Sequence, residues 1–318
     1  MFEERPLLRH TVEPSSSFVS HELNSMSMIL VMSSSMIGYR PLNRSHLYYC
    51  RSAFGVHNEV VNIWTHFVPF LMMLFIYILP ELQSTDPRPT LLLLYFGIAT
   101  LVGCSTVAHT MHSRSYLDHF FWWCIDFSGI AIWSMSAGIT RWQLEDHRGE
   151  FFDWVFPVLL VVLVGIQFIS TSFLFVAFPH WKYRLQLTRM LTCLVVAIYV
   201  HLPGALQLFK ALFEWTFTPR EWLQWQAIIW LAASGVFMGA GVPERWFPGR
   251  FDLLGYGHQL FHVCINLVNW NLIEEARVEM ETRTTPVKSD RIQIASMILL
   301  FSTAAIGYIN YYLKKVCF

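Results

Sequence analysis

Eight long apolar segments run through this chain, separated by shorter polar stretches. A helix needs roughly 17 to 25 mainly apolar residues to cross the hydrocarbon core of a bilayer, and each segment has about that length. The segments are Ile63–Leu79, Leu91–His109, Phe120–Thr140, Trp154–Phe178, Leu187–Phe209, Trp222–Gly241, Tyr256–Ile273 and Ile292–Leu313. The pattern predicts an all-α, polytopic membrane bundle with a seven-helix core and an eighth C-terminal transmembrane helix.

The remaining segments complete the predicted organisation. Residues 1–37 are serine-rich and weakly patterned, which predicts a flexible cytoplasmic tail. Residues 38–61 mix tyrosines with arginines, as expected of an amphipathic segment at the membrane interface. We therefore expect the seven-helix core to occupy residues 62–274, an extracytoplasmic loop residues 275–291, and the eighth helix with a short tail residues 292–318.

The lysines and arginines set the expected orientation. With a cytoplasmic N-terminus and eight alternating spans, 13 of the 22 basic residues fall on the cytoplasmic side, and acidic residues prevail on the other side. This is the sense of the positive-inside rule. A form in which the last segment does not cross would instead place Lys314 and Lys315 outside. The prediction is a multi-pass protein of the plasma membrane with a cytoplasmic N-terminus.

Composition agrees with this class of protein and excludes others. The chain is 54% hydrophobic and 14% charged, whereas soluble domains carry about 25% charged residues. Its net charge of zero gives no basis for nucleic-acid binding. The six cysteines lie mostly inside apolar segments without CxxC spacing, as small apolar fillers do.

Three prolines interrupt the apolar segments: Pro69, Pro157 and Pro203. A proline inside a helix frees the carbonyl group one turn earlier from its backbone hydrogen bond. In a membrane helix we expect a neighbouring helix to supply the missing donor.

Candidate chemistry lies at the ends of the apolar segments. In the predicted topology, His109 ends the second span on the cytoplasmic side. Asp126 lies in the first turns of the third span, and His258 and His262 in those of the seventh, four residues apart on one helix face. Ionisable side chains at membrane depth are costly and mark functional sites. These four residues are therefore predicted to meet near the inner leaflet.

Three imidazoles can hold Zn²⁺ and leave a fourth position for water. His109, His258 and His262 are accordingly the predicted metal ligands, with Zn²⁺ as the cofactor. Asp126 could orient a water, act as a general base or accept a hydrogen bond from a ligand imidazole. Ser105, one turn before His109, could donate a hydrogen bond to a bound carbonyl. Asp126 and Ser105 are thus the candidate catalytic residues.

A simpler interpretation stays open at this point. A single membrane histidine commonly makes a packing hydrogen bond, and the H-x-x-x-H spacing occurs often by chance. His66, His112 and His119 compete for the same region. His201, towards the outer end of the fifth span, is predicted to be a packing residue.

Four stretches resemble the progestin and adipoQ receptor family. They are HNEVVNIWTH (His57–His66), STVAHTMHS (Ser105–Ser113), DFSGIAIW (Asp126–Trp133) and GHQLFHVC (Gly257–Cys264). The resemblance implies seven helices, a cytoplasmic N-terminus and a zinc ion near the inner leaflet. It implies that His109, His258 and His262 are the ligands, with Ser105 and Asp126 beside them. The GYRP and YYC stretches and the eighth segment are similar to the membrane progestin receptor branch.

Two functions follow from this resemblance. The first is a receptor for a progestin-like steroid or another lipid, such as a sphingolipid. This receptor would signal to cytoplasmic proteins including G proteins. The second is a zinc-dependent lipid amide hydrolase of the ceramidase type, whose product signals. A purely structural zinc is a third possibility, although an open three-histidine site is unusual for that role. The GxSxG, HExxH and Walker A motifs of soluble enzymes are absent.

Overall fold

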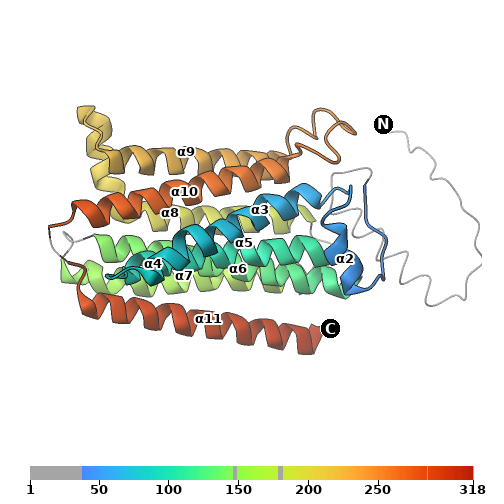
Figure 1. The fold of residues 1–318 in the computed structure, drawn as a ribbon, viewed down its shortest axis with the longest axis horizontal. Helices are drawn as coiled ribbons and strands as arrows, with labels where there is room; N and C mark the ends of the chain where they lie inside the picture. Colours follow the sequence, from blue (N-terminus) through green and yellow to red (C-terminus); the bar gives the residue numbers. More distant parts are fainter. Residues whose placement is uncertain (1–37, 146–148, 178–181, 285, 318) are drawn as a thin grey trace, which may run out of the picture.

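The computed structural model describes residues 38–145, 149–177, 182–284 and 286–317. The expected N-terminal tail lies outside these residues. Within them, long helices run side by side along one axis and form an elongated bundle (Figure 1). The helices are α2 (His46–Ser52), α3 (Val60–Met72) continued by η1 (Met73–Ile78) and α4 (Leu79–Gln83), α5 (Pro89–Met111), α6 (Tyr116–Leu144), α7 (Glu150–Ala177), α8 (Lys182–Glu214), α9 (Pro219–Ala240), α10 (Gly257–Thr282) and α11 (Ser289–Cys317).

The all-α membrane architecture predicted from the apolar pattern is confirmed. Each predicted segment falls within one long helix or, for the first, within the continuous rod α3–η1–α4, except that Gly241 and Tyr256 each lie one residue outside α9 and α10 and Phe178 lies outside the described residues. Six of these helices are long and apolar enough to cross a membrane, α11 among them. The other two, α6 and α10, carry more polar residues, many of which are buried inside the bundle. Their polarity serves the interior of the protein rather than its contact with lipid.

Helix α6 occupies the centre of the bundle. It packs against α5, α7, α8, α10 and α11, and buried residues occur along nearly its whole length. Helices α9 and α10 form a second closely packed pair. A helix that is buried all round needs neighbours on every side, and α6 obtains them because the other helices surround it.

The eighth long helix, α11, lies against α6 and α7. Polar contacts near both of its ends hold it. Asn310 Nδ2 donates to Ser128 Oγ at 2.6 Å, and Arg291 Nη2 pairs with Asp153 Oδ2 at 2.7 Å. Most of its remaining surface is exposed and apolar, as expected of a helix that faces lipid.

The two ends of the bundle differ in chemistry. The histidine end holds the C-terminus of α5 and the N-terminus of α10, with His109, His258 and His262. The ion-pair end, at the opposite ends of α6 and α10, holds a buried Arg141–Glu275 pair at 2.5 Å. Arg220 extends this network to further carboxylates on neighbouring segments.

Pro69 shows how the bundle compensates for a proline. The ring at Pro69 removes the donor for the carbonyl of Thr65, one turn earlier in α3. Asn266 Nδ2 from α10 donates to this carbonyl at 2.8 Å. The predicted compensation by a neighbouring helix is therefore present here, and it joins α3 to α10 beside the histidine end.

The segment before α3 folds back onto the end of α5. Arg40 is 6% exposed. Its guanidinium donates to the carbonyls of His109 and Thr110, both at 2.7 Å, and to Ser113 Oγ at 3.0 Å. The last carbonyls of a helix lack hydrogen-bond donors within the helix. The Arg40 guanidinium donates the missing hydrogen bonds. It thereby fixes the turn of α5 that carries His109.

Candidate metal centre

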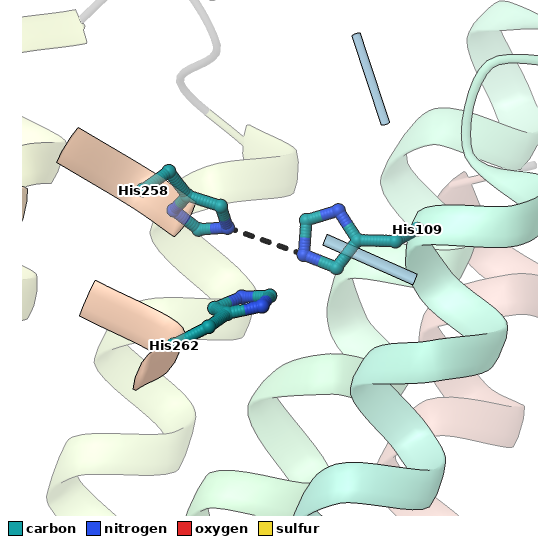
Figure 2. A group of neighbouring side chains, drawn as sticks. All are labelled: His109, His258 and His262. Atoms are coloured by element: carbon teal, nitrogen blue, oxygen red, sulfur yellow. Dashed lines mark hydrogen bonds between the residues drawn. The ribbon is translucent and has the colours of Figure 1, made fainter. Parts of the chain in front are cut away.

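Three imidazoles converge at the histidine end. His109 comes from the last turns of α5, and His258 and His262 come from the first turns of α10 (Figure 2). Nε2 of His109 lies 3.1 Å from Nε2 of His258. One nitrogen from each of the three rings lies within 4.8 Å of the other two. The structure thus brings together the three histidines selected from the sequence, although 149 positions separate the first two.

The second nitrogen of each ring is already engaged. Nδ1 of His109 lies 2.7 Å from a carboxylate oxygen of Glu59. Nδ1 of His262 lies 3.0 Å from Thr65 Oγ1, whose own proton goes to backbone carbonyls of α3. Nδ1 of His258 faces the sulfur of Met238 at 3.3 Å. All three partners can accept hydrogen bonds, so a proton on Nδ1 of each ring would satisfy these contacts and leave the lone pair of each Nε2 for a metal ion.

This protonation pattern leaves lone pairs facing one another. Two neutral imidazoles with free Nε2 lone pairs repel at 3.1 Å unless a cation lies between them. Two nitrogen ligands 2.0–2.1 Å from a tetrahedral Zn²⁺ stand about 3.3–3.4 Å apart. The donor set and spacing therefore fit a metal ion bound through three Nε2 atoms.

Glu59 connects the metal centre to the rest of the histidine end. Its Oε2 accepts from Asn62 Nδ2 at 2.8 Å in addition to its contact with His109. Asn62 also donates to the hydroxyl of Tyr256, which donates to the carbonyl of Asn58 at 3.0 Å. Residues at the starts of α3 and α10 thus hold the Glu59 carboxylate against a ligand of α5. A carboxylate in this position fixes ring orientation and strengthens the metal bond.

His112 and His119 form a separate pair beside the centre. Nε2 of His112 lies 3.6 Å from Glu59 Oε1, and its Nδ1 lies 3.3 Å from Nδ1 of His119. The sequence left open whether His112 joins the ligands. The structure places it against the other carboxylate oxygen of Glu59, in a second group with Glu59 and His109 that could also hold a metal ion.

Two aromatic rings enclose the ligands. His66 stacks on His262 with centroids 3.7 Å apart and planes inclined by 8°. Both nitrogens of His66 are buried and have no hydrogen-bond partner among the described residues. Trp123 meets His109 edge-on at 5.2 Å. These rings pack directly against the ligand imidazoles and restrict their rotation.

Asp126 and Ser105 lie next to the centre rather than within it. The Ser105 hydroxyl is within hydrogen-bonding reach of the Asp126 carboxylate, and both side chains are buried. His109 and Arg189 lie within electrostatic range of the same carboxylate. Glu59, not Asp126, is the carboxylate that contacts a ligand imidazole. Asp126 is therefore free to face whatever occupies the adjoining space.

That space is a cavity of about 940 Å³ inside the bundle. Its wall includes Asp126, Ser105, His258 and His262 at the histidine end and extends along α8 and α9. Most of the lining is aliphatic or aromatic. Arg189 projects into it from α8, with its guanidinium 5.4 Å from the centroid of Phe127. The chemistry of the cavity is that of a site for an amphiphilic molecule.

The sequence interpretation missed four residues that shape this site: Glu59, Thr65, Met238 and Arg189. Glu59 lies before the first apolar segment, and the other three look like ordinary helix residues. Glu59 and Thr65 could have been suspected from the sequence, because both lie within the HNEVVNIWTH stretch (His57–His66). His201, predicted to be a packing residue, instead lines the cavity.

The fold and the site define a polytopic helical membrane protein with a candidate metal centre open to an internal cavity. A family model described as haemolysin-III related matches residues 54–270. Since this range covers more than half of the chain, the protein belongs to the haemolysin-III related family. The predicted resemblance to progestin and adipoQ receptors is confirmed.

Relatives cover most of the chain. Membrane progestin receptor alpha-B of Danio rerio is 24% identical over 306 residues, which are 87% of this chain and 82% of that protein. Membrane progestin receptor beta of Homo sapiens is 26% identical, covering 77% of this chain and 72% of that protein. The Mus musculus beta receptor is 27% identical with the same coverage. Together with the six candidate spans, these relatives identify the chain as an integral membrane protein.

Proposed function

We propose that this protein is a membrane receptor whose internal cavity binds a progestin-like steroid or another lipid, beside a Zn²⁺ ion held by His109, His258 and His262. The observation that carries the proposal is the continuity between the cavity and the three-histidine centre. The relatives named as membrane progestin receptors support the steroid assignment. A ligand that binds one arrangement of the bundle more tightly than another shifts their populations.

Bound zinc would supply a positive charge at the end of the cavity and polarise a carbonyl group placed there. Glu59 and Thr65 orient the imidazole rings of His109 and His262. The apolar walls of the cavity exclude water. In the proposed topology the histidine end faces the cytoplasmic leaflet, where G proteins and other signalling partners would sense the change. The plasma membrane is the proposed location.

Progesterone binding to purified protein tests the receptor proposal, with a variant that fills the cavity. Gly235 lines the cavity, and a Cβ built there meets no atom within 4 Å. Gly235→Phe should therefore abolish binding while the protein still folds. Gly307→Phe is the matched control, because Gly307 on α11 also has open space around its Cβ and lies outside the cavity wall. Equal binding by both variants would refute a ligand in this cavity.

The second candidate function is a lipid amide hydrolase, and the Asp126–Ser105 pair favours it. A buried carboxylate beside a metal centre can move a proton, and a serine hydroxyl can donate to a developing oxyanion. Sphingolipid-like substrates such as ceramides match the apolar cavity. Ceramide turnover by the purified protein would favour the hydrolase function over direct steroid signalling.

A further inference from the structure

The cavity has a second group of polar side chains along its wall, away from the metal centre. His201 from α8 and Gln224 from α9 line it there, and Gln167 from α7 lines it between these two and Arg189, since its Nε2 donates to Cys193 Sγ at 3.0 Å. Arg189, which lies near the histidine end, is 12 residues before His201 in α8. At 1.5 Å per residue these two positions are about 18 Å apart along the helix. A mainly apolar stretch of wall separates the two polar regions.

These side chains contain polar atoms without partners. Nδ1 of His201, Nε2 of Gln224 and Oε1 of Gln167 are buried and make no hydrogen bond to the described residues. Gln224 is 1% exposed and Gln167 is 3% exposed. A buried polar group without a hydrogen bond costs about 1–3 kcal/mol. Three such groups on one cavity wall indicate that the molecule occupying the cavity completes their hydrogen bonds.

His201 and Gln224 lie close to each other. A Cβ built at Gly204 would be 2.6 Å from Nε2 and 2.7 Å from Oε1 of Gln224, so this amide rests directly on the α8 backbone. Gly204 is three residues after His201, which places both on one face of α8. Glycine at this position therefore allows the Gln224 amide to approach His201.

His201 and Gln224 are both neutral hydrogen-bonding groups when His201 is unprotonated. Arg141 lies within electrostatic range of His201 and is paired with Glu275. A charged ligand group would remain uncompensated by an opposite charge from these two side chains. A hydroxyl or carbonyl group would meet both donors and acceptors.

We propose that His201 and Gln224 form a distal polar subsite, which binds an uncharged hydroxyl or carbonyl at the end of the ligand remote from the metal centre. This inference rests on the proposed receptor function. It makes the ligand a molecule with a polar group at each end and an apolar body between them. Molecules with only one polar end bind more weakly because they leave the subsite unpaired.

The test measures binding of three probes to the purified full-length protein. The probes are progesterone, an analogue whose acetyl group is replaced by ethyl, and an analogue whose ring ketone is replaced by methylene. The variants are Gln224→Leu and His201→Leu. Ile228→Leu is the control, because Ile228 lines the same cavity one turn further along α9 and has no polar side chain. His201→Gln keeps a hydrogen-bonding side chain and checks that the loss is not one of folding.

The expected result is a loss of about ten-fold in progesterone affinity for both leucine variants, with Ile228→Leu unchanged and His201→Gln close to wild type. The analogue that lacks the polar group bound by the subsite should bind the wild type about ten-fold more weakly than progesterone does. Its affinity should fall little further in the leucine variants. Equal losses for all three probes, or no loss for progesterone, would refute the subsite while leaving the receptor function standing. Failure of the wild type to bind any probe would refute the progestin-like ligand of the proposed receptor, and the subsite with it.

Discussion

Glu59 holds His109 through a 2.7 Å contact between its carboxylate and Nδ1 of the imidazole. This single contact determines which nitrogen of His109 faces His258. Because Asn62 donates to the same carboxylate, the start of α3 orients a metal ligand at the end of α5. The proposed metal affinity therefore depends on a residue that does not itself belong to the three-histidine group.

Replacing Glu59 with glutamine should lower zinc affinity about 10- to 100-fold, the usual effect of removing such an outer carboxylate. The amide keeps the size of the side chain but loses the charge that strengthens the ligand. Competition with a calibrated zinc chelator measures the change. Glu274→Gln is the control, because Glu274 pairs with Arg277 in α10, away from the histidine end. Equal zinc affinity for wild type and Glu59→Gln would contradict the assigned role.

Removing two ligands should remove the metal. We expect the purified wild type to contain one zinc ion per chain, and the double variant His258→Ala/His262→Ala to contain none. His112→Ala should retain the ion, because His112 contacts Glu59 and is not one of the three proposed ligands. Elemental analysis after exhaustive dialysis measures each content. A metal-free wild type would contradict the proposed zinc site.

Much of this site was predictable because the apolar pattern specifies the topology. Alternating spans place the end of one and the start of another on the same side, which was sufficient to bring His109 near His258. Nothing in the pattern specifies how a side chain turns within the bundle. The contacts of Thr65 and Met238 with ligand nitrogens depend on such rotations, so they could not be predicted from the pattern.

The cavity was beyond sequence reasoning for a related reason. Aromatic and aliphatic residues that line an internal space have the same composition as those that face lipid. His201 therefore resembled a packing residue, and only the structure shows that it borders open space. The segment before α3 was similarly ambiguous, since Arg40 suited a headgroup contact as well as the carbonyl contacts it makes. Its position relative to a membrane remains a prediction.

Asp126→Asn separates the two candidate functions. The amide retains the shape of the carboxylate and should leave zinc content unchanged, because the contacts of the three ligand histidines do not include Asp126. It removes the group proposed to move a proton, so ceramide turnover, if the wild type shows any, should fall at least 100-fold. Progesterone binding should change far less. Undiminished turnover in Asp126→Asn would exclude this residue as the general base.

At the ion-pair end, we predict an effect on the free energy of unfolding that does not depend on a bound ligand or metal. Arg141 and Glu275 are both buried and lie 2.5 Å apart, so Arg141→Met leaves a carboxylate buried without its main partner. Removing one member of a buried pair destabilises a protein by about 3–5 kcal/mol. The double variant Arg141→Met/Glu275→Leu should recover most of this loss, since it leaves neither charge unpaired. Unfolding in mixed micelles with increasing denaturing detergent measures the three free energies. A double variant as unstable as the single one would show that the pair acts through the wider network around Arg220 rather than through its own charges.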